Sequence, residues 1–412
     1  MKKVWDKWTR IALVKRILVG LILGAILGIA VPQATGIAIL GDVFVSALKA
    51  IAPLLVFFLV ISSLCNAGKS HGGVIKTVII LYMFSTVLAA VIAVFASMAF
   101  PVKMTLANAA TDTSAPQGIV EVLNNLLLNV VANPVASLVN ANYVGILMWA
   151  VLLGLAFRVA DKMTKKVLAD VADGISMVVT WIINLAPFGI FGLVFNTVST
   201  NGLDIFTTYG KLLVLLVGCM LFIYFVTNPL LVYWCIRQNP YPLIFQCLKR
   251  SALTAFFTRS SAANIPVNMK VCEEMGLDRD TYSVTIPLGA TINMDGAAIT
   301  ITVMTMATAF TLGIHVDIPT AIILSLLAAL SACGASGVAG GSLLLIPMAC
   351  SLFGISDDIS MQVVAVGFII GVVQDSVETA LNSSSDLLLS ASAEFRQWRL
   401  EGKEIKFKIR LQ

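Results

Sequence analysis

The stretch that decides the fold is Cys333-Gly-Ala-Ser-Gly-Val-Ala-Gly-Gly-Ser342, in the middle of a run without charged residues, 318–356. The apolar arms on either side, 318–332 and 343–356, are shorter than the roughly 20 residues that a helix needs to cross a bilayer. The sequence therefore predicts two half-helices that meet at a glycine-rich tip and enter and leave the membrane on the same side. Two ordinary spanning helices are the simpler alternative, but irregular backbone at that depth is tolerated only inside protein or along a cavity.

The composition places the whole chain in the membrane class. Of its 412 residues, 58% are hydrophobic and only 12% are charged, and the mean hydropathy is +0.95. Soluble domains carry about a quarter charged residues. Upstream of the glycine-rich run, six uncharged stretches are about as long as a membrane span: 17–41, 50–68, 77–102, 136–157, 175–203 and 212–236.

Lysine and arginine alternate between the two sides of these stretches, which predicts the topology. The N-terminus, the loops at 69–76 and 158–166 and the stretch 237–250 are basic, whereas the loops between them are nearly free of positive charge. By the positive-inside rule the N-terminus is cytoplasmic, and so is the basic C-terminus. An even number of spans follows, and we expect eight. The net charge of +5 reflects this topology rather than nucleic-acid binding, and we expect no cleaved signal peptide because the basic start lacks a small-residue cleavage site.

A second interrupted segment, Thr258-Arg-Ser-Ser-Ala-Ala-Asn-Ile-Pro266, lies between two basic, cytoplasmic stretches. We expect it to form a hairpin that enters from the cytoplasm. Each hairpin is followed by a polar, interrupted span, and two such units of opposite orientation are typical of inverted-repeat transporters. The sequence thus predicts an all-α polytopic membrane protein with about eight transmembrane helices and two re-entrant helical hairpins.

The span after the first hairpin contains Pro287-Leu-Gly-Ala-Thr-Ile-Asn-Met-Asp-Gly296. A carboxylate in the middle of a span, here Asp295, costs at least ~2.5 kcal/mol on the insertion scale. Gly289 and Gly296 would let the helix unwind and free its carbonyl oxygens. Carboxylate, amide and carbonyl oxygens together suit a hard monovalent cation, so we interpret this segment as a cation site. The alternative is an aspartate that is buried against Asn293 or a serine in a kinked helix.

The final span carries five polar residues, and a helical projection places them together. At about 100° per residue, their directions relative to the first are roughly 0°, −60°, +40°, −20° and +20° for Asp375, Glu378, Thr379, Asn382 and Asp386. A stripe with three carboxyl groups is untenable against lipid, so it should face a cavity. A wet cytoplasmic helix end could explain Asp386, but Asp375 follows about four turns of mostly apolar helix.

A weaker signal lies in the third span, at Tyr82-Met-Phe-Ser85-Thr86. Hydroxyl groups in the middle of a membrane helix more often bond to carbonyl oxygens of their own helix. From the residues alone, these three side chains therefore favour a structural role.

Four motifs in the right order make the sequence resemble the dicarboxylate/amino acid:cation (sodium) symporter family, which has the glutamate-transporter fold. They are Arg259-Ser-Ser, Asn293-Met-Asp-Gly296, the glycine-rich tip 334–342 and Asp375-xxx-Thr379-xx-Asn382-xxx-Asp386. The resemblance covers essentially the whole chain and is closest to the bacterial members that carry serine and threonine with sodium. It implies inverted repeats and alternating access without covalent chemistry, so we expect a carrier and not an enzyme.

The resemblance also implies three sites for Na⁺, the coupling ion, and no organic cofactor. One site would combine side chains with the carbonyl groups of Gly289 and Asn293; its side chains are Asn382 and Asp386. A second would contain Asn293 and Asp295 with the three residues of the third span, Tyr82, Ser85 and Thr86. The third would use Thr291 and carbonyl groups of the second hairpin, around Ser331, Ala332 and Ala335.

The substrate would lie between the two hairpin tips. Asp375 would pair with the ammonium group of an amino acid. Its carboxylate would be held by Asn382, Ser261 and the amides near Gly337. The other residues expected in this site are Thr379, Ser260, Glu378, Arg259 and Ala297.

Two departures from the family pattern bear on the substrate. Members that carry acidic substrates have an arginine just before the threonine of the last-helix motif, and here that position is Glu378. A carboxylate there would repel a second carboxylate on the substrate. The residue after Asn-Met-Asp-Gly, often threonine, is Ala297. Both changes favour a small neutral amino acid such as serine or threonine, and we expect Arg259 to neutralise Glu378.

The resemblance implies a division of the chain and its surroundings. Residues 1–236 would be the scaffold and trimerisation unit with spans 1–6, of which span 3 contributes to an ion site. Residues 237–393 would be the transport core, and 394–412 a basic cytoplasmic tail. We expect a homotrimer in the lipid of a bacterial inner membrane, without nucleic acid as a partner.

Three alternatives remain at this point. A dicarboxylate or acidic amino-acid symporter, coupled to sodium or protons, has the same fold, and Glu378 disfavours it. Asp295 with Asp375 or Asp386 could form the dyad of an intramembrane aspartyl protease, but the usual GxGD-type motif is absent. A passive ion channel fits poorly, because broken helices that converge on one site suit occlusion better than a continuous pore.

Overall fold

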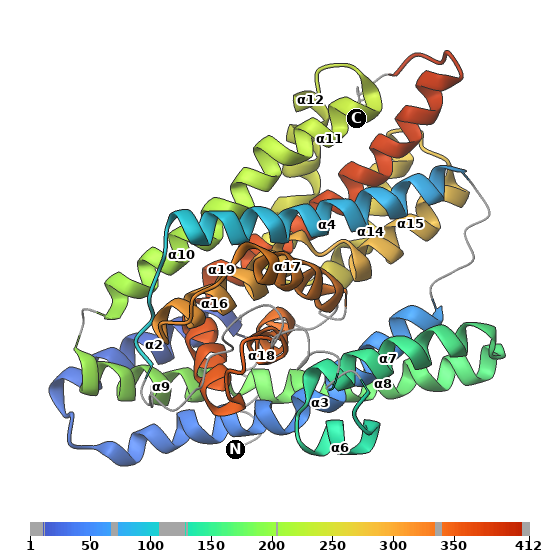
Figure 1. The fold of residues 1–412 in the computed structure, drawn as a ribbon. Coiled ribbons are helices and arrows are strands. Elements are labelled where there is room, and N and C mark those ends of the chain that lie inside the picture. Colours follow the sequence, from blue (N-terminus) through green and yellow to red (C-terminus); the bar gives the residue numbers. More distant parts are fainter. Residues whose placement is uncertain are drawn as a thin grey trace.

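A computed structural model of the chain describes residues 11, 13–66, 73–106, 128, 131–202, 205–333 and 340–405. Regular structure within these ranges is helical, with no strand among them (Figure 1). Six helical segments are long and apolar enough to cross a membrane: Thr35–Asn66, Gly73–Ala99, Lys162–Asn184, Phe206–Ile236, Arg279–Thr311 and Asp357–Leu400. The prediction of an all-helical, polytopic membrane protein is confirmed.

The first predicted stretch, 17–41, is not one helix. Helix α2 (Leu13–Ala30) ends before Pro32, and a short helix η1 (Thr35–Ala38) leads into α3 (Ile39–Asn66). The break falls at Pro32 because proline has no N–H to donate to the helix.

Helix α2 packs against α9 (Ala186–Asn201) backbone to backbone. A Cβ atom at Gly20 would lie 2.2 Å from the carbonyl oxygen of Pro187, and one at Gly24 would lie 2.6 Å from that of Phe191. Only glycine permits this approach. Small residues serve the same purpose in membrane helices generally, because packing replaces the hydrophobic effect there.

Two further predicted stretches are also interrupted. The stretch 175–203 is divided between α8 (Lys162–Asn184) and α9, which has Pro187 in its first turn. The stretch 136–157 contains α6 (Pro134–Val139), α7 (Tyr143–Ala156) and the short η2 (Phe157–Val159). The apolar stretch 136–157 is therefore divided among short helices rather than forming one.

The interrupted segment 258–266 joins two helical arms that pack against each other. Its first arm is α12 (Tyr241–Cys247), the π-helical η4 (Leu248–Ala252) and α13 (Leu253–Thr258), and its second arm is α14 (Ser261–Glu274). Arg259 turns the chain with a φ of 52°, in the left-handed region. We call 241–274 the first hairpin. It follows α10 (Ile205–Phe222), the π-helical η3 (Ile223–Thr227) and α11 (Asn228–Ile236).

The glycine-rich run also separates two short helical arms. These are α17 (Ile318–Ala332) and, on the other side, η5 (Gly341–Leu345) with α18 (Ile346–Ser351). Residues 334–339 of the tip lie outside the described ranges. We call 318–351 the second hairpin. Between the hairpins lie α15 (Arg279–Ile292) and α16 (Asp295–Thr311), and α19 (Asp357–Leu400) follows.

Helix α19 is the centre of this half of the chain. Its 44 residues extend over about 66 Å at 1.5 Å per residue. It contacts both hairpins, α15, α16 and α4 (Gly73–Ala99), and α4 also packs along α16 (Figure 1). The polar stripe of α19 is therefore enclosed by protein from several sides.

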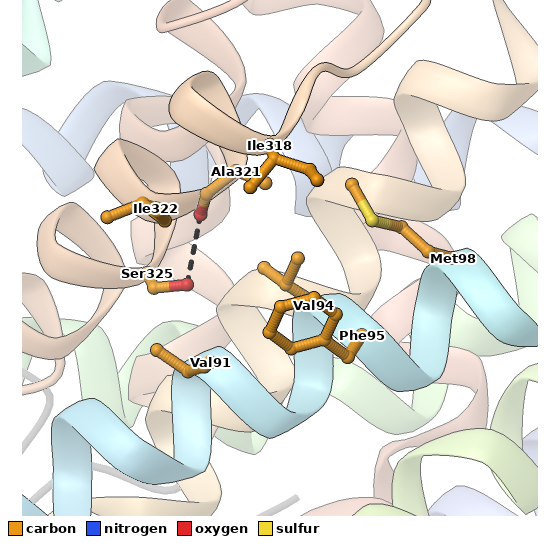
Figure 2. A pocket seen from close by; sticks show the side chains of 8 residues that line it. All are labelled: Val91, Val94, Phe95, Met98, Ile318, Ala321, Ile322 and Ser325. Atoms are coloured by element: carbon orange, nitrogen blue, oxygen red, sulfur yellow. Dashed lines mark hydrogen bonds between the residues drawn. The ribbon is translucent and has the colours of Figure 1, made fainter.

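The first arm of the second hairpin rests on α4 along an apolar seam. The side chains that line a small pocket between the two helices are Val91, Val94, Phe95, Met98, Ile318, Ala321, Ile322 and Ser325 (Figure 2). The polar one, Ser325, donates its hydroxyl to the carbonyl oxygen of Ala321 on its own helix, at 3.0 Å. The seam therefore joins α17 to α4 through apolar contacts.

Candidate functional site

The helix that carries Asp295 is broken between α15 and α16. Asn293 (φ −98°, ψ 79°) and Met294 (φ −119°, ψ 54°) have left the helical conformation. The Asn293 amide donates to Oδ1 of Asp386 at 2.9 Å, and the backbone amide of Gly296 donates to Oδ1 of Asn382 at 2.7 Å. Two hydrogen bonds thus connect the broken segment to the polar stripe of α19.

The helix unwinds between Gly289 and Gly296, as predicted, but the residues that leave the helix are Asn293 and Met294, and both glycines lie within helical turns. They provide space instead. A Cβ atom at Gly289 would lie 2.8 Å from both Oδ1 of Asp386 and the Tyr82 hydroxyl, and one at Gly296 would lie 2.9 Å from Cα of Glu378. The glycines therefore let α4 and α19 approach the broken helix.

Asp295 is fully buried and receives hydrogen bonds from α4. The Ser85 hydroxyl donates to Oδ2 of Asp295 at 2.8 Å, and the Thr86 hydroxyl donates to Oδ1 at 3.2 Å. On the same helix, the Tyr82 hydroxyl donates to the carbonyl oxygen of Asp386 at 2.8 Å. Ser85 and Thr86, whose sequence pattern favoured a structural role, thus bond to a buried carboxylate, and Tyr82 bonds to the backbone of a residue that carries another.

The five polar residues of α19 are all buried, from 3% to 6% exposed except for Asp386 at 1%. This agrees with the prediction that the stripe avoids lipid. Asp375 lies nearest to the hairpins. Its Oδ2 accepts a hydrogen bond from Nε of Arg259 at 2.6 Å, and its Oδ1 accepts one from the backbone amide of Gly340 at 3.2 Å. One carboxylate thus connects residues beside both hairpin tips.

Glu378 has a different set of partners, and the predicted pairing with Arg259 is wrong. Its Oε2 accepts hydrogen bonds from the hydroxyls of Thr300 (2.7 Å) and Ser342 (2.9 Å) and from the Gln374 amide. Arg259 instead pairs with Asp375, because it turns the first hairpin next to that carboxylate. Neutral donors from α16, α19 and the second hairpin therefore surround Glu378.

The remaining predicted substrate residues lie around these carboxylates. The Thr379 hydroxyl donates to the carbonyl oxygen of Asp375 at 2.8 Å, on its own helix. Ser260 caps α14 by accepting from the Ala263 amide, Ser261 is buried beside it, and Ala297 is completely buried in α16. Gly337, predicted near the substrate carboxylate, lies outside the described residues.

Of the residues predicted for the third sodium site, Thr291 is near the end of α15 and Ser331 and Ala332 are at the end of α17. The thiol of Cys333 lies 3.6 Å from the carbonyl oxygen of Ile292, which brings these two ends together. The hydroxyls of Thr291 and Ser331 bond to carbonyl oxygens of their own helices, Leu288 and Leu327. Ala332 ends α17, and Ala335 lies outside the described residues.

Two further polar residues, Asn228 and Gln374, bond within this region and were not predicted from the sequence. Asn228 of α11 accepts from Ser85 and donates to Ser385 at 2.9 Å, so it links α4 to α19. Gln374 donates to both Thr300 and Glu378. Both are uncharged polar residues in apolar helices. Their polarity is the single feature of the sequence that could have pointed to them.

The region has an excess of buried carboxyl groups. Four of them are at most 5% exposed: Asp295, Asp375, Glu378 and Asp386. Of the ion pairs formed among the described residues, only that of Arg259 reaches this group. Because uncompensated buried charges are very costly, these groups must either bind cations or carry protons.

The sequence matches the Sodium:dicarboxylate symporter family over residues 13–394, and the chain belongs to this family. A relative named serine/threonine transporter SstT, from Bifidobacterium adolescentis, is 57% identical over 406 residues, which cover 98% of this chain and 94% of the relative. A protein of the same name from Streptococcus thermophilus is 55% identical over 400 residues, 97% of this chain and 100% of the relative. The predicted family is confirmed, and the chain is a transporter and not an enzyme.

Proposed function

We propose that the protein is a sodium-coupled secondary transporter that imports small neutral amino acids, with serine and threonine as its main substrates. The observation that best supports coupling to a cation is the group of buried carboxyl groups around α19, of which only Asp375 forms an ion pair among the described residues. The choice of substrate is supported by the relatives named serine/threonine transporters, which match over nearly the whole chain.

We assign Na⁺ to the three sets of ligands expected from the sequence. The first comprises Asn382 and Asp386 with carbonyl groups of Gly289 and Asn293. The second comprises Asn293 and Asp295 with Tyr82, Ser85 and Thr86. The hydroxyls of Ser85 and Thr86 bond to the Asp295 carboxylate, and that of Tyr82 bonds to the carbonyl oxygen of Asp386. In the third, Thr291 joins carbonyl groups near Ser331, Ala332 and Ala335. Hard oxygen ligands of this kind are what Na⁺ uses in broken-helix transporters.

The substrate site that we propose is centred on Asp375, which would bind the ammonium group of the amino acid. Asn382, Ser261 and the amides near Gly337 would bind its carboxylate. Because Arg259 already holds Oδ2 of Asp375 at 2.6 Å, the ammonium group would share this carboxylate with a resident cation. Glu378, held by three neutral donors, would keep a second substrate carboxylate away.

Transport would proceed by alternating access, with residues 237–393 as the moving core and the hairpins as gates. Polar bonds also tie α4 and α11 to this core through Asp295 and Ser385, so we include α4 and α10–α11 in the moving unit. The remaining N-terminal helices would form the scaffold and a homotrimer interface. We place the protein in a bacterial inner membrane with eight spans, two re-entrant hairpins and both termini in the cytoplasm.

The decisive experiment is uptake into proteoliposomes after a sodium jump, with a panel of labelled amino acids. We expect serine and threonine to accumulate only when an inward Na⁺ gradient is present, and aspartate to compete weakly. Accumulation of serine that does not depend on the Na⁺ gradient would contradict the proposal. Ion conduction without accumulation of any amino acid would contradict it as well.

The second candidate is a sodium:dicarboxylate symporter, which the description of the family favours. Glu378 argues against it, because a second carboxylate on the substrate would meet a buried acidic group. Saturable, Na⁺-dependent uptake of aspartate or succinate with higher apparent affinity than serine would establish this alternative.

A further inference from the structure

A long groove lies between α4 and α10 on the side of the molecule away from the carboxylate cluster. It has a volume of about 1050 Å³, and the two helices that form it lie side by side (Figure 1). The described residues that line it are Ile92, Phe95, Ala96, Ala99, Phe100, Pro101, Val102, Gly210, Lys211, Val214, Leu215, Gly218, Cys219 and Phe222.

The floor of this groove contains two glycines with free space above them. A Cβ atom at Gly210 or at Gly218 would meet no atom within 4 Å. These glycines therefore differ from Gly20 and Gly24, which are pressed against a neighbouring helix. The space above them is open to an occupant that is not part of the described chain.

The groove has one charged side chain, and it lies near one end. Lys211 is exposed, near the start of α10 and on the side where α4 ends at Ala99. From Lys211 to Phe222, α10 advances about 16 Å at 1.5 Å per residue. This is about half of the ~30 Å hydrocarbon core, which is the depth of one lipid leaflet.

We propose that this groove binds one anionic phospholipid, with an acyl chain along the groove and its phosphate at Lys211. Lipid tails gain nothing from leaving other lipid tails for an apolar protein surface. Selectivity must therefore come from the head group, and the ammonium of Lys211 at the leaflet end of an otherwise apolar channel supplies it. By the predicted topology Lys211 lies on the external side, so it would act through direct contact with the lipid phosphate and not through the surface potential of the cytoplasmic leaflet. An exposed ion pair contributes at most about 1 kcal/mol, or roughly a fivefold preference.

The test is photolabelling of the purified full chain in phosphatidylcholine nanodiscs. A trace of phosphatidylglycerol or phosphatidylcholine carries a diazirine on one acyl chain, and adducts on segments 92–102 and 210–222 are counted by peptide mass spectrometry. We expect the phosphatidylglycerol probe to label these segments about fivefold more than the phosphatidylcholine probe. The Lys211→Gln variant should lose this preference, while labelling by phosphatidylcholine stays the same.

Gly218→Leu should reduce labelling by both probes, because its side chain enters open space in the groove without a backbone clash. Gly174→Leu is the matched control, since this exposed helical glycine of α8 also has nothing within 4 Å of a Cβ. Lys270→Gln, which removes an exposed charge from α14, controls for net charge. Equal labelling of wild type by both probes, or unchanged labelling of Gly218→Leu, would overturn the proposal. So would a groove that neither lipid labels, as expected if a second protein chain covers it.

Discussion

Arg259 and Asp375 form an ion pair, with Nε of Arg259 2.6 Å from Oδ2 of Asp375. The pair joins the turn of the first hairpin to the polar stripe of α19, and both side chains are nearly buried, at 11% and 5% exposure. The other oxygen of Asp375 accepts the amide of Gly340, beside the tip of the second hairpin. The carboxylate that we expect to bind the substrate ammonium therefore also connects the two hairpins.

Removal of either partner of this pair should destabilise the protein more than removal of both. Breaking a buried pair leaves one uncompensated charge, which costs about 3–5 kcal/mol. We expect Arg259→Gln and Asp375→Asn to show a coupling of about 3 kcal/mol or more in a thermal-unfolding cycle in detergent. Strictly additive losses would mean that the two side chains do not interact in the folded protein.

Glu378→Gln should lower serine uptake, and Arg259→Gln should not rescue it. A neutral acceptor forms weaker hydrogen bonds than a carboxylate, by about half, and three donors point at Oε2 of Glu378. We expect a loss of about tenfold, which corresponds to 1.4 kcal/mol, in initial uptake rates. Ser342→Ala, which removes one of these donors, should have a smaller effect. Recovery of uptake in the double variant would support a pairing of Arg259 with Glu378, which the structure contradicts.

Gly289→Ala should weaken sodium dependence strongly. Its Cβ would come within 2.8 Å of both Asp386 Oδ1 and the Tyr82 hydroxyl, so one of these ligand candidates must move. We expect the Na⁺ concentration for half-maximal uptake to rise at least tenfold, measured with saturating serine. Gly371→Ala is the control, because a Cβ there meets nothing within 4 Å and the substitution favours helix by ~1 kcal/mol. An equal response of both variants would exclude a specific role for Gly289.

Ser85→Ala should raise the Na⁺ requirement without unfolding the protein. The hydroxyl of Ser85 donates to the buried Asp295 at 2.8 Å, and a lost hydrogen bond to a buried charge costs about 1–3 kcal/mol. The matched control on the same helix is Ser97→Ala, whose hydroxyl bonds only to the carbonyl oxygen of Ala93 at 2.7 Å. A sodium titration of uptake should separate the two variants by about tenfold or more, and identical titrations would remove Ser85 from the site.

Lys49→Gln should change the transport rate, because Lys49 connects α3, in the proposed scaffold, to α19, in the proposed core. Its Nζ lies 2.7 Å from Asp358 and 3.1 Å from Asp357, at the start of α19. Exposed ion pairs contribute at most about 1 kcal/mol, so we expect a change of up to about fivefold that disappears in choline chloride of high ionic strength. Lys403→Gln breaks a local pair with Glu401 and should leave the rate unaltered. A salt-independent effect of Lys49→Gln would argue against an electrostatic contact.

The sequence predicted the parts of the fold that depend on hydrophobic length and on costly polar groups. The two hairpins and the buried stripe of α19 followed from short apolar arms and from the helical projection. The sequence did not predict that the helix breaks at Asn293 and Met294. A glycine in a sequence shows that the backbone can adopt many conformations, but it does not show whether the glycine unwinds the helix or only leaves space for a neighbour. Gly289 and Gly296 stay helical and give space to Asp386 and Glu378.

Side-chain pairing was less predictable, as the partner of Arg259 illustrates. Asp375 and Glu378 are three residues apart on one helix, so both were near enough in a projection to meet a cation from the first hairpin. The choice depends on where the hairpin turns and on the neutral donors around Glu378, and these come from segments far away in sequence. Asn228 was missed for the same reason, since its partners Ser85 and Ser385 come from α4 and α19.

The glycine face of α2 has a consequence for biosynthesis. Its partner α9 begins about 155 residues after α2 ends, and at ~5–20 residues per second the ribosome needs roughly 8–30 s to reach it. During that time the backbone of α2 around Gly20 and Gly24 lacks the helix that it is shaped to meet. Helix α2 must therefore remain without this partner beside the translocation machinery or in lipid. We expect bulky residues at these glycines to impair assembly first and transport only as a result.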